Sequence, residues 1–303
     1  MVPVQRLSFA TLVATDLERS IAYFRETTGF HLAAREGDGA FFATEMGRLA
    51  IELRRGGTAG LARLSFEMAM EVDEAARTLR ALGVESRIRS DPFPGARRAL
   101  SFLDPCGTEI ELFSGTDFLS SVPFGVGVKP LKLGHVARFC SDLPKVIAFY
   151  EKVLGFRVSD WVGDYFVFLR CDADHHAVNF FRGPVTQLHH MAFELKDMAH
   201  MQSACDALAS ARIPVGWGPL RQSAGHNMAV YHRSDDGHAV EYYCELDQMK
   251  SELLGYFDPR PWHEDHPQRP KVWDPSSWEA GWGTPPAPHF GRSKHGAELK
   301  PGL

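Results

Sequence analysis

Hydrophobic and polar positions along this chain alternate in a pattern that predicts strands and helices in a fixed order. An apolar strand is expected at 7–14, followed by a helix that begins after Asp16 and ends near Gly29. An apolar strand at 64–70 and a helix at 72–82 come next. Two strands joined by the turn sequence DPCG then complete the set.

The same order of elements returns in the second half of the chain. Residues 133–158 match residues 7–32 at a constant offset, so that Asp142 corresponds to Asp16 and Gly155 to Gly29. The segment HMAFEL at 190–195 matches RLSFEM at 63–68, and RSDDGHAVEYY at 233–243 matches LDPCGTEIELF at 103–113. We therefore expect an α+β fold with two tandem βαβββ modules, at 1–115 and 131–250, joined by a linker at 116–130.

The final segment, 251–303, differs in composition from both modules. It is rich in proline and holds four tryptophans, namely Trp262, Trp273, Trp278 and Trp282. A disordered extension rarely carries so many aromatic residues, so we expect the tail to pack on the modules and to cover the mouth of a pocket.

Charge and composition narrow the classes of function. Lys and Arg number 33 against 38 Asp and Glu, a net charge of -5, which makes nucleic acid and anionic membranes poor partners. No apolar run approaches the roughly 20 residues that span a bilayer, and the N-terminus lacks the pattern of a signal peptide. Five cysteines without a CxxC spacing argue against a disulfide framework and a cysteine zinc site. A cytoplasmic protein is expected.

Histidine distinguishes the two modules. Of 14 histidines, only His31 precedes residue 130. The repeat aligns His135 with Phe9, His190 with Arg63, and Glu241 with Glu111.

A single histidine in a strand is more often a core or surface residue than a ligand, but here the candidates fall in three repeat-matched blocks. Two imidazoles and one carboxylate form the facial triad that suits non-haem Fe(II), and Mn(II) shares these ligand preferences. Adjacent strand residues point to opposite faces, so only one of His189 and His190 can be a ligand. We choose His190, because Met-Ala-Phe-Glu follows it as the strand register requires.

The segments LGHVARFCSDL, LHHMAFEL and GHNMAVYHRSDDGHAVEYY resemble the type I extradiol ring-cleaving dioxygenases of the vicinal oxygen chelate superfamily. The resemblance covers residues 1 to about 250. It implies modules of the glyoxalase/bleomycin-resistance type, of which the first has lost its ligands and the second binds Fe(II) through His135, His190 and Glu241. It also implies an aromatic diol and dioxygen as substrates, and a homo-oligomer.

The resemblance implies residues around the metal as well. Tyr231, whose repeat counterpart is Ser101, is expected to hydrogen-bond a substrate oxygen or supply a proton. His176 is expected to relay a proton near dioxygen, with the adjacent His175 as the alternative. Gln222 stands where the family commonly has histidine, and glutamine does not titrate near neutral pH.

Further expectations concern the pocket and competing functions. We expect an apolar and aromatic wall that includes Phe168, Phe180 and Trp217, with His226 nearby. The departure at Gln222 keeps open a different metalloenzyme of the same superfamily or a diol-binding protein. A zinc hydrolase is a further alternative from the ligand types alone.

Overall fold

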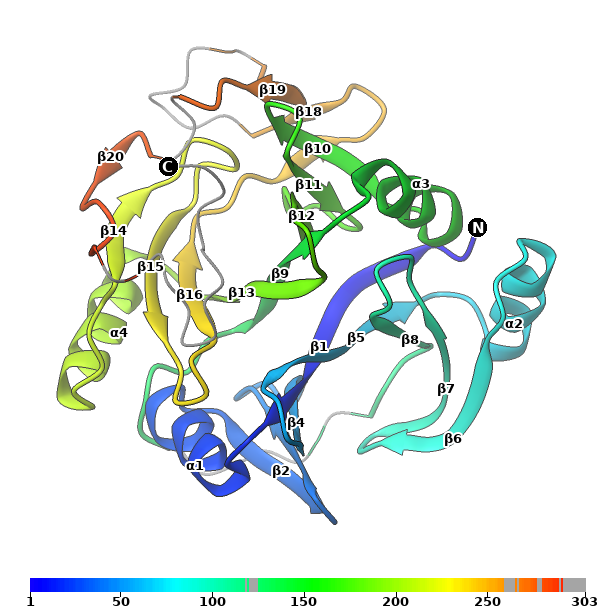
Figure 1. Cartoon of the computed structure of the whole chain (residues 1–303), viewed down its shortest axis with the longest axis horizontal. Coiled ribbons are helices and arrows are strands. Elements are labelled where there is room, and N and C mark those ends of the chain that lie inside the picture. The colour runs from blue at the N-terminus through cyan, green and yellow to red at the C-terminus, as the bar shows by residue number, and fades with distance from the viewer. Residues whose placement is uncertain are drawn as a thin grey trace.

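The computed structural model describes residues 1–117, 119, 125–258, 265, 267–276, 280–288 and 290 (Figure 1). The first module forms one sheet of eight strands in the order β2-β3-β4-β1-β5-β8-β7-β6. Its strands are β1 (Val4–Ala14), β2 (His31–Glu36), β3 (Gly39–Ala43), β4 (Leu49–Arg55), β5 (Gly60–Met68), β6 (Arg87–Phe93), β7 (Ala96–Leu103) and β8 (Glu109–Phe113).

The second module repeats this arrangement as β10-β11-β12-β9-β13-β16-β15-β14, and the tail adds β19 and β20 at its two edges. The module strands are β9 (Lys132–Cys140), β10 (Arg157–Val162), β11 (Phe166–Arg170), β12 (Val178–Arg182), β13 (Gln187–Glu194), β14 (Trp217–Arg221), β15 (Met228–Arg233) and β16 (Ala239–Cys244). The strands of the tail are β17 (Met249–Ser251), β18 (Tyr256–Phe257), β19 (Lys271–Trp273) and β20 (Trp282–Gly283).

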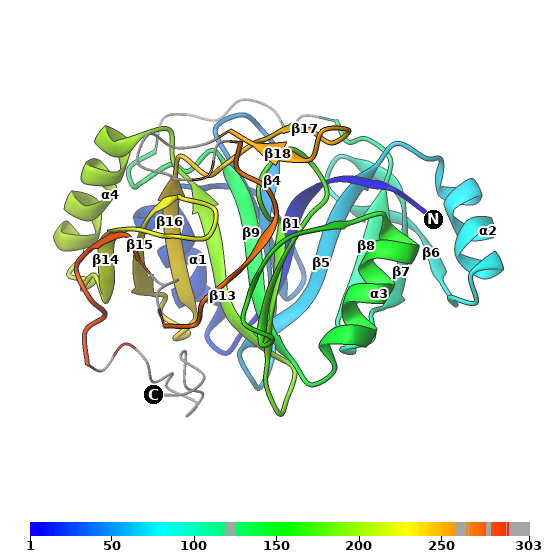
Figure 2. The ribbon, with the colours of Figure 1, turned by 90° about the horizontal axis from the view of Figure 1, so that it is seen from above.

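The predicted α+β fold class and tandem repeat are confirmed, and each module contains the βαβββ pattern twice. In the first module, the pattern runs from β1 to β4 around α1 (Leu17–Ala22), which continues as the π-helical turn η1 (Tyr23–Thr27), and again from β5 to β8 around α2 (Val72–Ala81). The second module has α3 (Leu143–Leu154) and α4 (Met198–Ser210) in the same places. The helices lie outside the curled sheets (Figures 1 and 2).

Two of the helices begin at the capping aspartates that the sequence predicts. The side chain of Asp16 accepts a hydrogen bond from the backbone N–H of Arg19, and that of Asp142 accepts one from Lys145. These caps satisfy amide groups that have no partner inside the helix. At its other end, α3 stops at Gly155, whose φ of 75° is the left-handed conformation that favours glycine.

Strand register makes the two modules directly comparable. Phe9 pairs with Ser65 as His135 pairs with Ala192, and Ser65 pairs with Glu111 as Ala192 pairs with Glu241. The repeat alignment made from the sequence is therefore also the structural one.

The inner faces of the two sheets differ in their contents. Phe9, Phe93 and Phe113 fill the inner face of the first module, with ring centroids 4.8 and 5.0 Å apart in successive pairs. Phenylalanine thus occupies the space that corresponds to His135 in the second module.

Buried contacts join the modules. Arg138 Nη2 donates to Asp104 Oδ2 at 2.7 Å and to the Tyr150 hydroxyl at 2.9 Å. Beside this cluster, a disulfide connects Cys106 with Cys140. The expectation of no disulfide is wrong for this pair, whose partners come from different modules and share no sequence motif.

The tail extends the second sheet at both edges. Strand β19 pairs with β10, and β20 pairs with β14. Trp273 is half-buried against this sheet, as expected, whereas Trp282 is 54% exposed, so the packing prediction is wrong for that residue. Trp262 and Trp278 lie outside the described residues. In the part of the chain that the structure describes, no helix is long and apolar enough to cross a membrane.

His232 links stability to pH at the module boundary. Its Nε2 lies 2.6 Å from the hydroxyl of Tyr23, and burial lowers the pKa of His232 to about 3. An unfolded chain titrates this group near pH 6.5. Its contribution to stability is therefore complete above about pH 6.5 and is lost as the pH falls toward 3, by about 1.4 kcal/mol per pH unit.

We expect His232→Gln, which keeps a polar side chain but does not titrate, to flatten this pH dependence. Urea unfolding at several pH values between 4 and 8 measures the effect. The variant's free energy of unfolding should fall less steeply than that of the wild type below pH 6.5. His31→Gln, at a partly exposed site, serves as the control and should change the slope much less. Parallel curves for wild type and His232→Gln would contradict the assignment.

Candidate metal centre and active site

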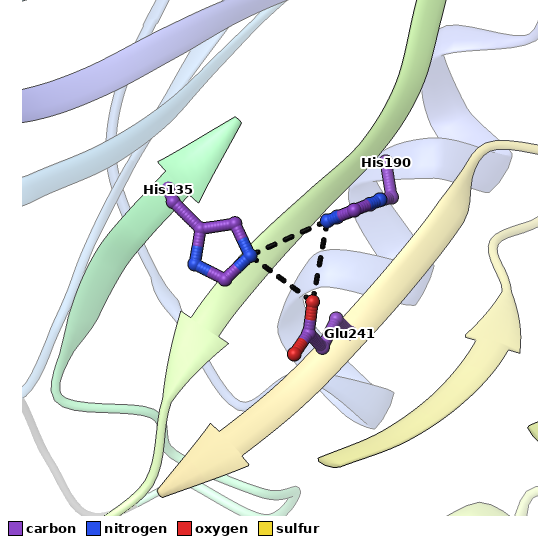
Figure 3. A group of neighbouring side chains, drawn as sticks. All are labelled: His135, His190 and Glu241. Carbon is purple, nitrogen blue, oxygen red and sulfur yellow. Dashed lines mark hydrogen bonds and ion pairs between the residues drawn. The ribbon is translucent and has the colours of Figure 1, made fainter. Parts of the chain in front are cut away.

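Three adjacent strands bring the predicted ligands together. His135 on β9, His190 on β13 and Glu241 on β16 all project from the same face of the sheet (Figure 3). All three are at most 5% exposed. Gly134, next to His135, leaves space for the buried side chain of Tyr243, because a side chain at 134 would collide with the ring and hydroxyl of that tyrosine.

The three ligand atoms fit one ion. His135 Nε2 lies 3.1 Å from Glu241 Oε2, His190 Nε2 lies 3.2 Å from the same oxygen, and the two nitrogens are 3.3 Å apart. Two ligand atoms that are each about 2.1 Å from an ion, at right angles, lie about 3 Å from each other. The geometry and the two-nitrogen, one-oxygen donor set therefore suit a divalent transition metal with open positions.

The electrostatics of the triad also suit a metal. Burial lowers the pKa of His135 and outweighs the opposing effect of Glu241. Burial alone would raise the pKa of Glu241, but His135 and His190 outweigh it and hold that pKa well below its ordinary value. The His135 ring is thus neutral and the carboxylate ionised at neutral pH, which are the states that bind metals.

The first module fills the equivalent space with an ion pair. Arg63 Nη2 donates to Glu52 at 2.6 Å, and Nη1 donates to Glu111 at 3.2 Å. Within the described residues, His135, His190 and Glu241 are the one group of three or more potential ligands whose atoms converge. The loss of ligands expected for the first module thus corresponds to a guanidinium that neutralises the retained glutamate.

Two supporting contacts to the ligands were not predicted. Asn227 Nδ2 donates to Glu241 Oε1 at 2.9 Å, and His189 Nδ1 lies 2.6 Å from His190 Nδ1. The expectation that His189 points to the opposite face is wrong, because a register shift between Leu188 and His190 bulges the strand and turns the His189 ring toward His190. Partners of this kind fix ligand orientation in metalloproteins.

The two candidate proton-relay histidines lie in different places: His176 is next to the metal ligands and His175 is next to Asp160. The ring of His176 lies 4.2 Å from that of His135, centroid to centroid. His175 lies behind it, with its Nδ1 3.0 Å from His176 Nδ1 and its Nε2 3.1 Å from Asp160. Burial, assisted by the nearby histidines, places the pKa of His176 well below its usual value. His176 is therefore the neutral ring next to the metal ligands.

Tyr231 and Gln222 form the opposite side of the site. Gln222 Nε2 donates to the Tyr231 hydroxyl, and the Tyr231 ring lies 5.7 Å from that of His190. Trp217 stacks on Tyr231 with ring centroids 4.9 Å apart. Burial and the charge of Glu241 raise the pKa of Tyr231 well above its ordinary value, so the hydroxyl keeps its proton.

Of the three other residues predicted to line the pocket, one lies next to the site, and the contacts described for the other two are with residues outside the triad. Phe168 lies 5.1 Å from the His176 ring, next to the site. Phe180 does not face the site: it packs in the main core against Tyr150 and under Arg138, while its neighbour Phe181 takes the inner face. His226 is buried and holds its Nδ1 2.5 Å from Asp247 rather than from the triad.

Comparisons with known proteins agree with the fold and identify the family. The model of the Glyoxalase/Bleomycin resistance protein/Dioxygenase superfamily matches residues 6–112 and 132–242, one stretch in each module. The chain is 26% identical over 260 residues to 3-methylcatechol 2,3-dioxygenase of Pseudomonas putida strain F1, covering 79% of this chain and 89% of that protein.

A second relative is also named as a dioxygenase of an aromatic diol. Biphenyl-2,3-diol 1,2-dioxygenase of Paraburkholderia xenovorans strain LB400 is 25% identical over 262 residues, covering 79% of this chain and 87% of the relative. Among solved structures, the Mn(II)-bound glyoxalase from Novosphingobium aromaticivorans superposes with a TM-score of 0.79 at 24% identity, covering 96% of this chain and 94% of that one. The resemblance to ring-cleaving dioxygenases is thus confirmed, and the chain belongs to the Glyoxalase/Bleomycin resistance protein/Dioxygenase superfamily.

Proposed function

We propose that the protein is an extradiol dioxygenase that opens a catechol-type aromatic ring beside its two hydroxyl groups at a mononuclear Fe(II) centre. The observation that carries the proposal is the convergence of His135, His190 and Glu241 on one buried point. Three protein ligands leave positions for both oxygens of a diol and for dioxygen. Both oxygen atoms of O2 enter the ring-opened product, a hydroxymuconic semialdehyde for catechol.

The metal supplies what side chains cannot. Fe(II) held by His135, His190 and Glu241 would favour the deprotonated diol at neutral pH and would supply the redox chemistry that dioxygen requires. We propose Fe(II) as the resident ion and Mn(II) as the alternative, since both accept two imidazoles and a carboxylate. The Mn(II) bound by the glyoxalase from Novosphingobium aromaticivorans supports keeping the alternative.

The chain's own residues handle protons and orientation. Tyr231 stays protonated and can donate to a substrate oxygen, and Gln222 restrains its hydroxyl by donating to it. On the other side, His176 is a neutral ring that can take a proton and return it. Phe168 and Trp217, each next to one of these residues, supply apolar walls for an aromatic substrate.

A second candidate rests on Gln222. An amide at this position orients the Tyr231 hydroxyl but neither gains nor loses a proton. Diol binding without turnover would need no titrating group at this position, and a different reaction of the same superfamily would have to move its protons through other residues. Turnover of catechols distinguishes these functions from ring cleavage.

We expect the wild type to bind about one Fe(II) or Mn(II) per chain under anaerobic conditions. His190→Ala should weaken binding by about 100-fold or more, because changes that only disturb the partners of ligands already cost 10- to 100-fold. Metal content after desalting, measured by mass spectrometry, checks this. The matched control is His31→Ala in the first module, which should bind as the wild type does. Retention of stoichiometric metal by His190→Ala would place the ion elsewhere.

The Fe(II)-loaded enzyme should consume one O2 per catechol and form a yellow product. An oxygen electrode and visible absorbance, followed together for catechol, 3-methylcatechol and 2,3-dihydroxybiphenyl, measure the stoichiometry. Both signals should disappear in His190→Ala. Stoichiometric iron without oxygen uptake on any of these diols would instead favour the second candidate.

Tyr231→Phe should lower kcat by about 10²-fold while metal content stays at the wild-type level, because it removes a proton donor but no ligand. The control is Tyr242→Phe, which removes a buried hydroxyl from the neighbouring strand on the side of the main core. Stopped-flow turnover under saturating diol separates the two variants. Equal rates for Tyr231→Phe and wild type would remove Tyr231 from the proposed chemistry.

A further inference from the structure

One buried carboxylate connects the tail to the histidines of the site. Asp160, on β10, is 1% exposed. Its Oδ1 accepts from the backbone N–H of Lys271 at 2.8 Å. Its Oδ2 accepts from the indole N–H of Trp273 at 2.6 Å and contacts His175 Nε2 at 3.1 Å. A buried carboxylate without such donors would be strongly unfavourable, so strand β19 stabilises the charge of Asp160.

The first module shows that the fold forms without this carboxylate. A register shift between Val158 and Asp160 turns Asp160 to the inner face, opposite Phe168. The first module has the same shift, and there Ala34 stands opposite Phe41. The described part of that module also has no added edge strand corresponding to β19. The sheet therefore does not need Asp160 and its tail partners in order to form. Among the described residues, they occur only in the module that carries the candidate metal ligands.

The hydrogen-bond partners of His175 and His176 determine which ring nitrogen of each carries the hydrogen. An ionised carboxylate only accepts, so the His175 nitrogen that faces Asp160, Nε2, carries the hydrogen. In a neutral ring, the other nitrogen of His175, Nδ1, is then an acceptor. It faces His176 Nδ1 at 3.0 Å, so that nitrogen carries a hydrogen. The remaining nitrogen of a neutral His176 ring, Nε2, is left as an acceptor.

The surroundings hold His175 in this arrangement. Its backbone N–H donates to the carbonyl of Asp247 at 2.9 Å, and its side chain is fully buried. The rings of Phe168 and Phe257 lie 5.5 and 4.8 Å from the imidazole. Phe257 belongs to β18, so the tail contacts His175 directly as well as through Asp160.

We propose that Asp160, held in place by Trp273 of the tail, is a positioning residue that sets the tautomers of His175 and His176. Through this chain of contacts, Asp160 leaves Nε2 of His176 as the acceptor nitrogen of a ring that lies next to His135. The consequence for catalysis rests on the proposed function, in which His176 accepts a proton. The tautomers themselves do not depend on any reaction.

Two variants test the proposal: Trp273→Phe alone, and Trp273→Phe combined with Asp160→Asn. They differ only in whether residue 160 carries a carboxylate or an amide. Trp273→Phe removes the indole donor, and Asp160 can still accept from His175, so both tautomers should stay as in the wild type. Adding Asp160→Asn places an amide in the same position. Its oxygen can accept from Lys271 and its NH2 group can donate to His175 Nε2. We then expect both rings to reverse, to Nδ1–H in His175 and Nε2–H in His176.

Long-range 1H–15N correlation spectra of the full chain, labelled with 15N-histidine and loaded with diamagnetic Zn(II), report the tautomers directly. The wild-type spectrum is decisive by itself: an Nδ1–H tautomer of His175 would overturn the proposal, even if the double variant did not fold. So would unchanged tautomers in a folded double variant. Trp282→Phe, an exposed tail substitution, should leave the spectrum unchanged.

The kinetic consequence is measured separately on Fe(II)-loaded protein. The double variant should lose about 10- to 100-fold in kcat relative to Trp273→Phe, with KM for the diol changed only a few-fold. If no catechol is turned over by the wild type, the proposed function fails while the tautomer assignment stands or falls on the spectra. If the tautomers reverse and kcat does not change, the positioning role for His176 is overturned.

Discussion

An ionised carboxylate buried between two imidazoles is the interaction around which the second module is organised. Removing such a charge from water costs several kcal/mol unless other groups compensate. His135 and His190 compensate on one oxygen of Glu241, and the amide of Asn227 donates to the other. A divalent ion at the same point would complete the compensation, because it adds positive charge beside the carboxylate.

The first module solves the same problem without a metal. Glu111 occupies the position of Glu241, and Arg63 replaces His190 with a cation that is covalently part of the chain. Because Arg63 also pairs with Glu52, the guanidinium is satisfied on both sides. Phe9 then fills the place of the other histidine. The duplicated fold therefore keeps the buried glutamate and surrounds it differently in the two modules, with arginine in the first and with two histidines in the second.

Comparison of the repeats explains how much of the site is readable from sequence. Matched positions identified His135, His190 and Glu241, because aligned strands have the same register and the same inner face. Alternation along a strand failed at His189, where a bulge shifts the register, and no residue type signals that bulge. The prediction of Phe180 as a pocket residue was wrong, because the sequence does not show which of the adjacent Phe180 and Phe181 faces the site.

Contacts between distant segments of the chain could not be predicted from the sequence. The Cys106–Cys140 disulfide and the pairing of Asp160 with Trp273 join positions that share no motif and no fixed spacing. The second βαβββ unit within each module was not predicted, because the matched segments found in the sequence relate one module to the other and not the two halves of a module.

The position of the tail follows from the open edges of the second sheet. An edge strand presents unpaired backbone groups, and a parallel neighbour such as β19 satisfies them for β10. The same three-residue strand delivers a backbone N–H and an indole N–H to Asp160. One segment thus pairs with the sheet edge and also hydrogen-bonds the carboxylate that contacts His175. A substitution that loosened β19 as a whole would therefore remove both donors from Asp160, even though none of its residues contacts a metal ligand among the interactions described.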